Sequence, residues 1–119
     1  MSMKNIQPIN IGVIGYGYRG RELAGLLAEN PQYRLSAICD RQSEYRALLK
    51  RSEPMKQVGF YTDFRKILEN KELEAVVIAV PQYAHHPLAL AAFRAGKHVY
   101  TEKPMALSTS DAQEMIDCA

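Results

Sequence analysis

Three closely spaced glycines carry the strongest chemical signal in the first part of the chain. Residues 15–20 read Gly-Tyr-Gly-Tyr-Arg-Gly, a G-x-G-x-x-G pattern, between the apolar segment Ile9 to Ile14 and an amphipathic segment. In this pattern Gly15 permits a tight strand-to-helix turn, Gly17 lets a pyrophosphate approach the backbone, and Gly20 lets the helix pack on the strand. The helix N-terminus then presents unpaired N–H groups to an anion. The alternative is a glycine-rich turn with no ligand.

An acidic residue and a basic neighbour follow the next apolar segment. Asp40 closes the segment Leu35 to Cys39, and Arg41 comes directly after it. A carboxylate at this strand end accepts hydrogen bonds from the adenosine ribose and repels a 2′-phosphate, which favours NAD as the cofactor. A guanidinium there can bind a 2′-phosphate or stack on adenine, so Arg41 keeps NADP open. The alternative for Arg41 is a solvated surface residue.

These residues need a framework that brings them together. Short apolar runs alternate with amphipathic segments, which is typical of β-α-β-α order and a parallel sheet. Continuous hydrophobicity from Ala75 to Val80 favours a central strand that is covered on both faces. We expect an α/β fold of three layers, a doubly wound parallel sheet of about five strands with helices on both faces. The other strands are expected at Ile9 to Ile14, Leu35 to Cys39, Val58 to Tyr61 and His98 to Thr101.

Helix signals fill the intervals between these strands. Residues that favour helix N-termini are Ser43 for the second helix, Thr62 or Asp63 for the third, Pro87 for the fourth, and Ser110 with Gln113 for the last. Residues that end helices are Pro31, Pro54 and Gly96. No such signal ends the last helix before Ala119.

Composition narrows the class of protein. The 119 residues are 47% hydrophobic and 24% charged, which is typical of one soluble globular domain. The net charge of +2 comes with no basic run, so neither nucleic acid nor a membrane surface is an expected partner. Cys39 and Cys118 form no disulfide framework, and no signal peptide or membrane-spanning run is visible. We therefore expect a cytoplasmic protein.

The second half of the chain holds further polar motifs after its apolar segments. Val-Pro-Gln at residues 80–82 is followed by His85, residues 95–99 read Ala-Gly-Lys-His-Val, and residues 102–104 read Glu-Lys-Pro. Alone, a Glu-Lys pair after a strand is more often a solvated loop than a site. Adjacent His85 and His86 rarely ligate one ion, and no cysteine or acid cluster completes a set, so no metal is expected.

With the glycine turn, these motifs resemble the Gfo/Idh/MocA family over nearly the whole chain. The resemblance implies an NAD(P)-dependent oxidoreductase that transfers a hydride between a nicotinamide cofactor and a sugar, cyclitol or related polyol. Residues 1–119 would be its NAD(P)-binding Rossmann domain. The cofactor-binding residues that it implies are Gly15, Gly17, Tyr18, Arg19, Gly20, Asp40, Arg41, Val80, Pro81, Gln82, His85, Glu102, Lys103 and Pro104.

Within that resemblance, Lys103 is the expected catalytic residue. Family members use this lysine for substrate positioning or proton transfer, and Glu102 would lie near the nicotinamide ribose. Oxidation of a carbinol by hydride transfer also releases a proton. A lysine near the nicotinamide can orient the substrate oxygen and share in that proton transfer.

The family pattern continues with a sixth strand and a larger α/β domain that supplies the substrate pocket. Neither is expected within residues 1–119, so we expect a fragment that binds dinucleotide but turns over substrate poorly. An exposed side of the sheet would favour association into a homo-oligomer.

Other functions remain compatible with the motifs. One is a non-catalytic module that senses nicotinamide redox state or scaffolds a partner. Another is a nucleotide or S-adenosylmethionine site on a similar fold. The sequence also leaves open whether Tyr16 and Tyr18 stack on the cofactor or cover the turn.

Overall fold

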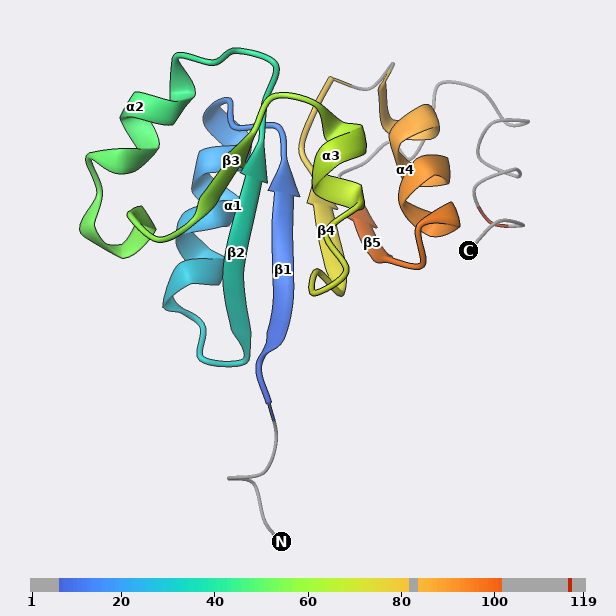
Figure 1. Ribbon diagram of the computed structural model, residues 1–119, viewed down its shortest axis with the longest axis horizontal. Coiled ribbons are helices and arrows are strands. Elements are labelled where there is room, and N and C mark those ends of the chain that lie inside the picture. Colours follow the sequence, from blue (N-terminus) through green and yellow to red (C-terminus); the bar gives the residue numbers. More distant parts are fainter. Residues whose placement is uncertain (1–6, 82–83, 102–115, 117–119) are drawn as a thin grey trace, which may run out of the picture.

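One parallel sheet organises the domain. The computed structural model describes residues 7–81, 84–101 and 116. In this part of the chain, five parallel strands lie in the order β3-β2-β1-β4-β5 (Figure 1). They are β1 (Ile9–Ile14), β2 (Tyr33–Cys39), β3 (Gly59–Tyr61), β4 (Ala75–Ile78) and β5 (His98–Thr101). The chain builds outward from β1 to β3 and then crosses to the other side of β1, so the strand order reverses between β1 and β4.

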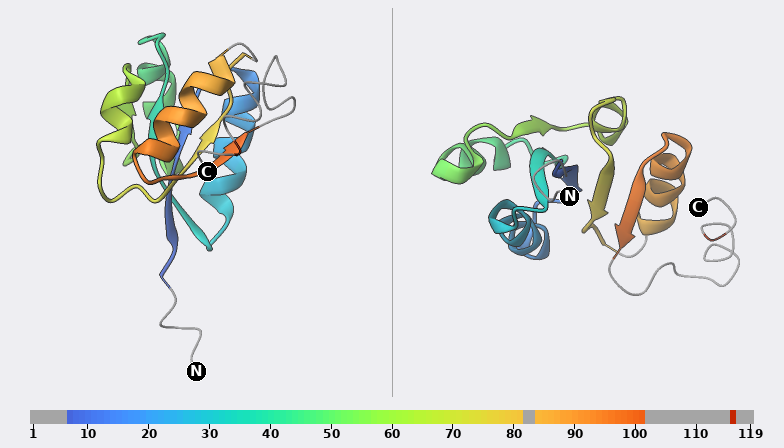
Figure 2. Two further views of the ribbon diagram at one scale, coloured as in Figure 1. Left: turned by 90° about the vertical axis from the view of Figure 1, so that its right-hand side faces the viewer. Right: turned by 90° about the horizontal axis from the view of Figure 1, so that it is seen from below.

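Helices cover both faces of this sheet. They are α1 (Tyr18–Glu29), α2 (Tyr45–Lys50), α3 (Phe64–Leu68) and α4 (His85–Arg94), with a short 3₁₀-helix, η2 (Glu53–Met55). In Figure 1, α3 lies in front of the strands and α1 behind them, and the left view of Figure 2 has these two helices on opposite sides of the strands. The three-layer α/β fold predicted from the sequence is confirmed.

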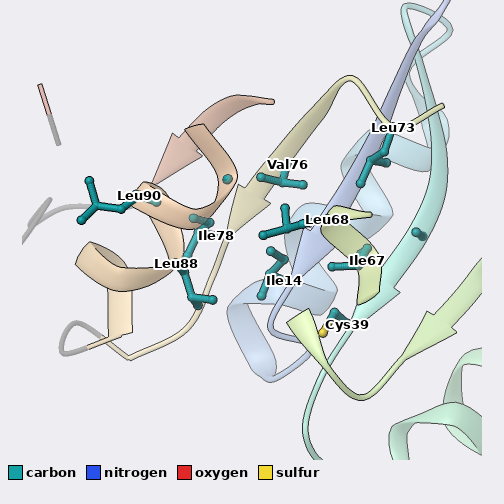
Figure 3. Close-up of a cluster of buried hydrophobic side chains, with 12 residues drawn as sticks. Ile14, Cys39, Ile67, Leu68, Leu73, Val76, Ile78, Leu88 and Leu90 are labelled. Carbon is teal, nitrogen blue, oxygen red and sulfur yellow. The ribbon is translucent and has the colours of Figure 1, made fainter. Parts of the chain in front are cut away.

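Successive residues of β4 enter two different hydrophobic cores. Val76 and Ile78 belong to a cluster with Ile67 of α3 (Figure 3), whereas Val77 belongs to a second cluster with Ala24 of α1. Successive side chains of a strand point to opposite faces of the sheet. β4 therefore buries both of its faces, which requires an apolar residue at every position. This is why the fourth apolar run is continuous and why β4 lies in the interior of the sheet.

Three strand boundaries differ from those expected. β3 begins at Gly59, one residue later than the expected Val58. β2 begins at Tyr33, earlier than Leu35, because Tyr33 already pairs with Ile9 of β1. β4 ends at Ile78, earlier than Val80. The N–H of Ala79 still donates to the carbonyl of Ile14 at 2.8 Å.

The helix caps follow the sequence signals in two of three testable places. Asp63 is the N-cap of α3, where its carboxylate accepts the N–H of Arg65 at 2.9 Å. Gly96 follows α4 with a φ of +79°, a left-handed conformation that glycine adopts without strain. The expected cap at Ser43 is wrong. The N-cap of α2 is Glu44, without a side-chain cap bond, and Ser43 contributes only its backbone carbonyl, to the N–H of Arg46.

A buried lysine fixes the start of β5. Lys97 is 8% exposed, and its Nζ donates to the carbonyls of Asn70 and Leu73, at 2.7 Å each, in the turn before β4. Burial lowers the pKa of Lys97. The Ala-Gly-Lys-His-Val motif therefore holds β5 beside β4.

Of the predicted last helix, the structure describes only Ile116, which is helical; the remainder lies outside the described residues. Within the described residues, none of the helices is long and apolar enough to cross a membrane.

Candidate functional site

A pocket of about 690 Å³ opens at the carboxyl ends of the central strands. Its walls come from the glycine turn after β1, the end of β2, the start of α3 and the segment after β4. Ligands of open α/β sheets bind at this edge, at the point where the strand order reverses. The predicted site residues that line the pocket are Gly15, Gly17, Asp40, Arg41, Val80 and Pro81.

The three glycines of the turn meet different surroundings. Gly15 has a φ of +103°, and a Cβ there would overlap the carbonyl oxygen of Ala79. A Cβ on Gly20 would overlap the carbonyl oxygen of Gly15. A Cβ on Gly17 would meet no atom within 4 Å. Gly15 and Gly20 are therefore required by packing inside the domain, whereas Gly17 borders open space where a ligand can approach the backbone.

The amides of the turn are divided between the sheet and the pocket. The N–H of Gly15 donates to the carbonyl of Cys39 at 2.7 Å, and the N–H of Tyr16 donates to Oδ2 of Asp40 at 2.7 Å. Gly17 is the N-cap of α1 and supplies no side-chain cap. The first N–H groups of a helix have no partner inside it, so this end of α1 can bind an anion beside Gly17.

Both oxygens of Asp40 accept backbone hydrogen bonds. Besides the bond from Tyr16, Oδ1 accepts the N–H of Gln42 at 2.8 Å. A carboxylate has about four lone-pair positions, so each oxygen keeps the capacity to accept a ligand hydroxyl. Arg41 is exposed and lines the same end of the pocket.

The two tyrosines of the turn differ in position. Tyr16 is 5% exposed, and its ring packs edge-to-face on Tyr45 with centroids 5.9 Å apart. Burial raises the pKa of Tyr16. Tyr18, in contrast, is 80% exposed at the start of α1 and is absent from the pocket wall. Tyr16 therefore covers the turn, one of the two roles that the sequence left open.

Three further predicted residues, Arg19, Gly20 and His85, lie outside the pocket wall. Arg19 forms an ion pair with Glu22 on the exposed side of α1. His85 is 2% exposed at the first residue of α4, and its Nε2–H donates to the carbonyl of Val80 at 2.8 Å. This geometry makes His85 a residue that fixes the loop from β4 to α4. A contact between His85 and a cofactor stays a prediction.

The predicted catalytic segment lies outside the described residues. This holds for Glu102, Lys103 and Pro104. Gln82, predicted to bind the cofactor, also lies outside the described residues. The last residue before that segment, Thr101, pairs with Ile78 at the carboxyl end of β4.

One wall of the pocket was missed by the sequence analysis. It is built by the start of α3, where Asp63, Phe64 and Arg65 line the pocket together with residues at the end of β2. The Nε of Arg65 lies 3.3 Å from Oδ1 of Asp63. The cap signal at Asp63 could have found this wall, because a helix that follows a parallel strand begins at the carboxyl edge of the sheet.

A thiol lies beneath this end of the pocket. Cys39 lies in the buried cluster of Figure 3 and is 2% exposed. Burial, followed by the carboxylates of Asp40 and Asp63, raises the pKa of Cys39 to about 12. Cys39 is therefore a neutral thiol that lines the floor and carries no nucleophilic charge near neutral pH.

Comparisons with known proteins show the family of the chain. Residues 9–119 match the family model of the Gfo/Idh/MocA group, described as an oxidoreductase family with an NAD-binding Rossmann fold. The chain is 29% identical to an α-N-acetylgalactosaminidase from Shewanella oneidensis over 121 residues, 96% of this chain and 26% of that protein. It therefore spans about a quarter of the length of the curated relatives that it matches.

Solved structures of oxidoreductases have a fold similar to that of this chain. A scyllo-inositol dehydrogenase from Lactobacillus casei, with bound cofactor NAD(H) and scyllo-inositol, matches with a TM-score of 0.85 and 25% identity, over 93% of this chain and 32% of that chain. A mutant of a 3-ketoreductase from Actinomadura kijaniata, in complex with TDP-benzene and NADP, matches with a TM-score of 0.85 and 26% identity, over 94% and 34% respectively.

The glycine turn, the pocket at the reversal of strand order and these matches together identify the chain. It belongs to the Gfo/Idh/MocA oxidoreductase family, as an NAD-binding Rossmann domain.

Proposed function

We propose that this domain holds the nicotinamide cofactor of an enzyme that transfers a hydride between NAD and a sugar, cyclitol or related polyol. The observation that carries the proposal is the open space beside Gly17, at the N-terminus of α1 and at the edge of the pocket. A pyrophosphate needs such a place, free of side chains and facing unpaired N–H groups.

The residues of the pocket fit the parts of a dinucleotide. The first amides of α1 would bind the pyrophosphate, and Asp40 would accept hydrogen bonds from the adenosine ribose. Arg41 would lie beside the same ribose, with the start of α3 as the opposite wall. Val80 and Pro81 would lie along the cofactor toward its nicotinamide end. The cofactor supplies hydride transfer when bound.

Lys103 completes the proposal as the residue that orients the substrate oxygen and exchanges its proton. On this proposal the substrate pocket comes from a domain outside residues 1–119, as the greater length of the relatives suggests. A cytoplasmic location and association with further copies of the chain are also expected. The test in the full-length protein is Lys103→Ala, which should lower kcat strongly and leave the affinity for NADH nearly unchanged. Unchanged activity would count against the assignment and favour a sensing module.

The cofactor itself is tested on the 119-residue chain by calorimetry with NADH and, separately, with NADPH. Gly17→Asp should abolish binding, because a carboxylate would occupy the phosphate position. Gly25→Asp adds the same charge to α1 at another open position and should leave binding intact. A folded chain that binds neither NADH nor NADPH would contradict the proposal.

The choice between NAD and NADP depends on Asp40 and Arg41 together. We propose NAD as the preferred cofactor, because Asp40 repels a 2′-phosphate. Arg41→Ala should weaken NADPH more than NADH, by about tenfold in the ratio of affinities, since one charge-assisted bond is lost. An unchanged ratio of the affinities for NADPH and NADH would show that Arg41 does not contact the 2′-phosphate.

A second candidate reaction is cleavage of a glycosidic bond. The relative from Shewanella oneidensis, named α-N-acetylgalactosaminidase, is the observation that favours it. Incubation of the full-length protein with NAD and either free polyols or aryl glycosides separates the two candidates. Net formation of NADH from a polyol supports the dehydrogenase, whereas release of the aglycone without net NADH supports the glycosidase.

A further inference from the structure

Asp40 is bonded to the glycine turn itself. Its Oδ2 accepts the N–H of Tyr16 at 2.7 Å, in the middle of the turn, and its Oδ1 accepts the N–H of Gln42 at 2.8 Å. Its own backbone N–H donates to the carbonyl of Tyr61 at the end of β3, at 3.0 Å. Asp40 therefore connects the turn to two neighbouring strands.

From this geometry we propose that Asp40 positions the glycine turn for the pyrophosphate, besides any contact that it makes with the ribose. This inference rests on the proposed function of the pocket as a dinucleotide site. A hydrogen bond from an amide to a carboxylate is stronger than one between neutral groups. It holds the peptide between Gly15 and Tyr16, which directly precedes the amide N–H groups that would bind phosphate.

At Gly17 the turn faces open space, so the bonds that hold this part of the turn come from the β2 side. Gly15 takes a φ of +103°, and a Cβ at Gly17 would meet no atom within 4 Å. The N–H of Gly15 is already used by the carbonyl of Cys39. The next amide along the chain, that of Tyr16, donates to Asp40. The amides from Gly17 onward belong to the start of α1. The turn is therefore held from the β2 side and open on the ligand side.

The side chain of Tyr16 supports the same orientation. Its buried ring packs on Tyr45, and the guanidinium of Arg21 lies 5.6 Å from the centre of the Tyr45 ring. The ring fixes Tyr16 against α2, while the carboxylate of Asp40 fixes the direction of its N–H. Together they set the position from which the chain enters α1.

Two ligands separate this role from a contact with the ribose. ADP offers a pyrophosphate and two ribose hydroxyls, whereas 2′,3′-dideoxy-ADP keeps the pyrophosphate and adenine but lacks both hydroxyls. If Asp40 positions the turn, Asp40→Ala should weaken both ligands by about tenfold, as expected for the loss of one charge-assisted bond. Asp40→Asn keeps one acceptor oxygen without the charge and should weaken both ligands by less. If Asp40 only contacts the ribose, the affinity for dideoxy-ADP should not change, and that result would overturn the inference.

A matched control comes from the far end of α1. Oδ1 of Asn30 accepts the backbone N–H of Gln32 at 2.9 Å, as the carboxylate of Asp40 accepts backbone N–H groups. Neither Asn30 nor Gln32 lines the pocket. Asn30→Ala should lower thermal stability without changing the affinity for either ligand. A loss of affinity in Asn30→Ala equal to that of Asp40→Ala would reduce the effect to general destabilisation and overturn the inference.

A second measurement needs no ligand. Amide hydrogen exchange by NMR should be about tenfold faster at Tyr16 in Asp40→Ala than in the unsubstituted chain, because the N–H loses its acceptor. The Gly15 amide, which donates to Cys39, is the internal reference. Unchanged exchange at Tyr16 contradicts the role of Asp40, whereas an unsubstituted chain that binds neither ADP nor NADH contradicts the proposed function instead.

Discussion

Gly20 lies directly against the carbonyl oxygen of Gly15, so that the first turn of α1 and the end of β1 share one close contact. This contact fixes the angle at which the helix leaves the sheet, and it leaves no room for a side chain. Gly25, one and a half turns further along the same helix, has open space at the position of a Cβ. The two glycines therefore predict opposite effects of the same substitution.

Gly20→Ala should lower the free energy of unfolding by about 3 kcal/mol, because the added methyl group overlaps backbone that cannot move freely. Gly25→Ala should raise it by about 0.5 to 1 kcal/mol, since alanine is the better helix former. Urea denaturation of the two variants measures both. Equal effects in the two variants would contradict the packing described for Gly20.

Lys97→Met should lower the free energy of unfolding by about 2 kcal/mol, because two backbone carbonyls lose a charged donor in a buried place. The apolar stem of the side chain is kept in methionine. Lys71→Met serves as the control, as Lys71 is exposed, and it should change stability by less than about 0.5 kcal/mol. A Lys97→Met variant as stable as the control would show that the carbonyls of Asn70 and Leu73 are satisfied without the lysine.

Cys39 should resist alkylation in the folded chain. Its pKa lies near 12, against an ordinary value of 9.0, so little thiolate forms below pH 10. Iodoacetamide labelling in a Cys118→Ser background, with and without denaturant, measures this. Fast labelling of the folded chain at pH 8 would contradict the raised pKa.

The same shift makes stability depend on alkaline pH. The folded state binds the Cys39 proton more tightly than the unfolded state, so this contribution is complete below pH 9 and is lost as pH rises toward 12. The stability difference between the unsubstituted chain and Cys39→Ala should therefore shrink as pH rises through this interval. Comparison of the two chains cancels the titration of their tyrosines and lysines.

Asp63 links the start of α3 to acid stability. The N–H and side chain of Arg65 lower the pKa of Asp63, so its ionised form is favoured by folding. The contribution is present above the ordinary carboxyl pKa of about 4 and is lost as pH falls below it. Asp63→Ala should lower the melting temperature at pH 7 and flatten its decline in acid. Asp63→Asn keeps a capping oxygen and should lose less at pH 7.

The sequence alone determined the local elements and the type of site. The continuous apolar run from Ala75 predicted the fourth strand, since a strand that buries both faces must be apolar at every position. The G-x-G-x-x-G spacing predicted the turn before α1, because the conformation of Gly15 and the contact of Gly20 are requirements of neighbouring residues in the chain. Asp40 and Arg41 were predicted at the end of a strand because they directly follow the apolar segment Leu35 to Cys39.

Tertiary structure decided which residues from distant segments share the pocket. Phe64 and Arg65 line the same pocket as Arg41 because β3 lies beside β2, and the strand order is a property of the folded sheet. The burial of Tyr16 against Tyr45 and the bonds from Lys97 to carbonyls before β4 likewise join residues far apart in the chain. Such contacts leave no periodic trace in the sequence, because each depends on where two separate elements pack. The spacing and types of residues record what the local backbone requires. Contacts across the sheet exist only once the layers have assembled, so the sequence pattern does not record them.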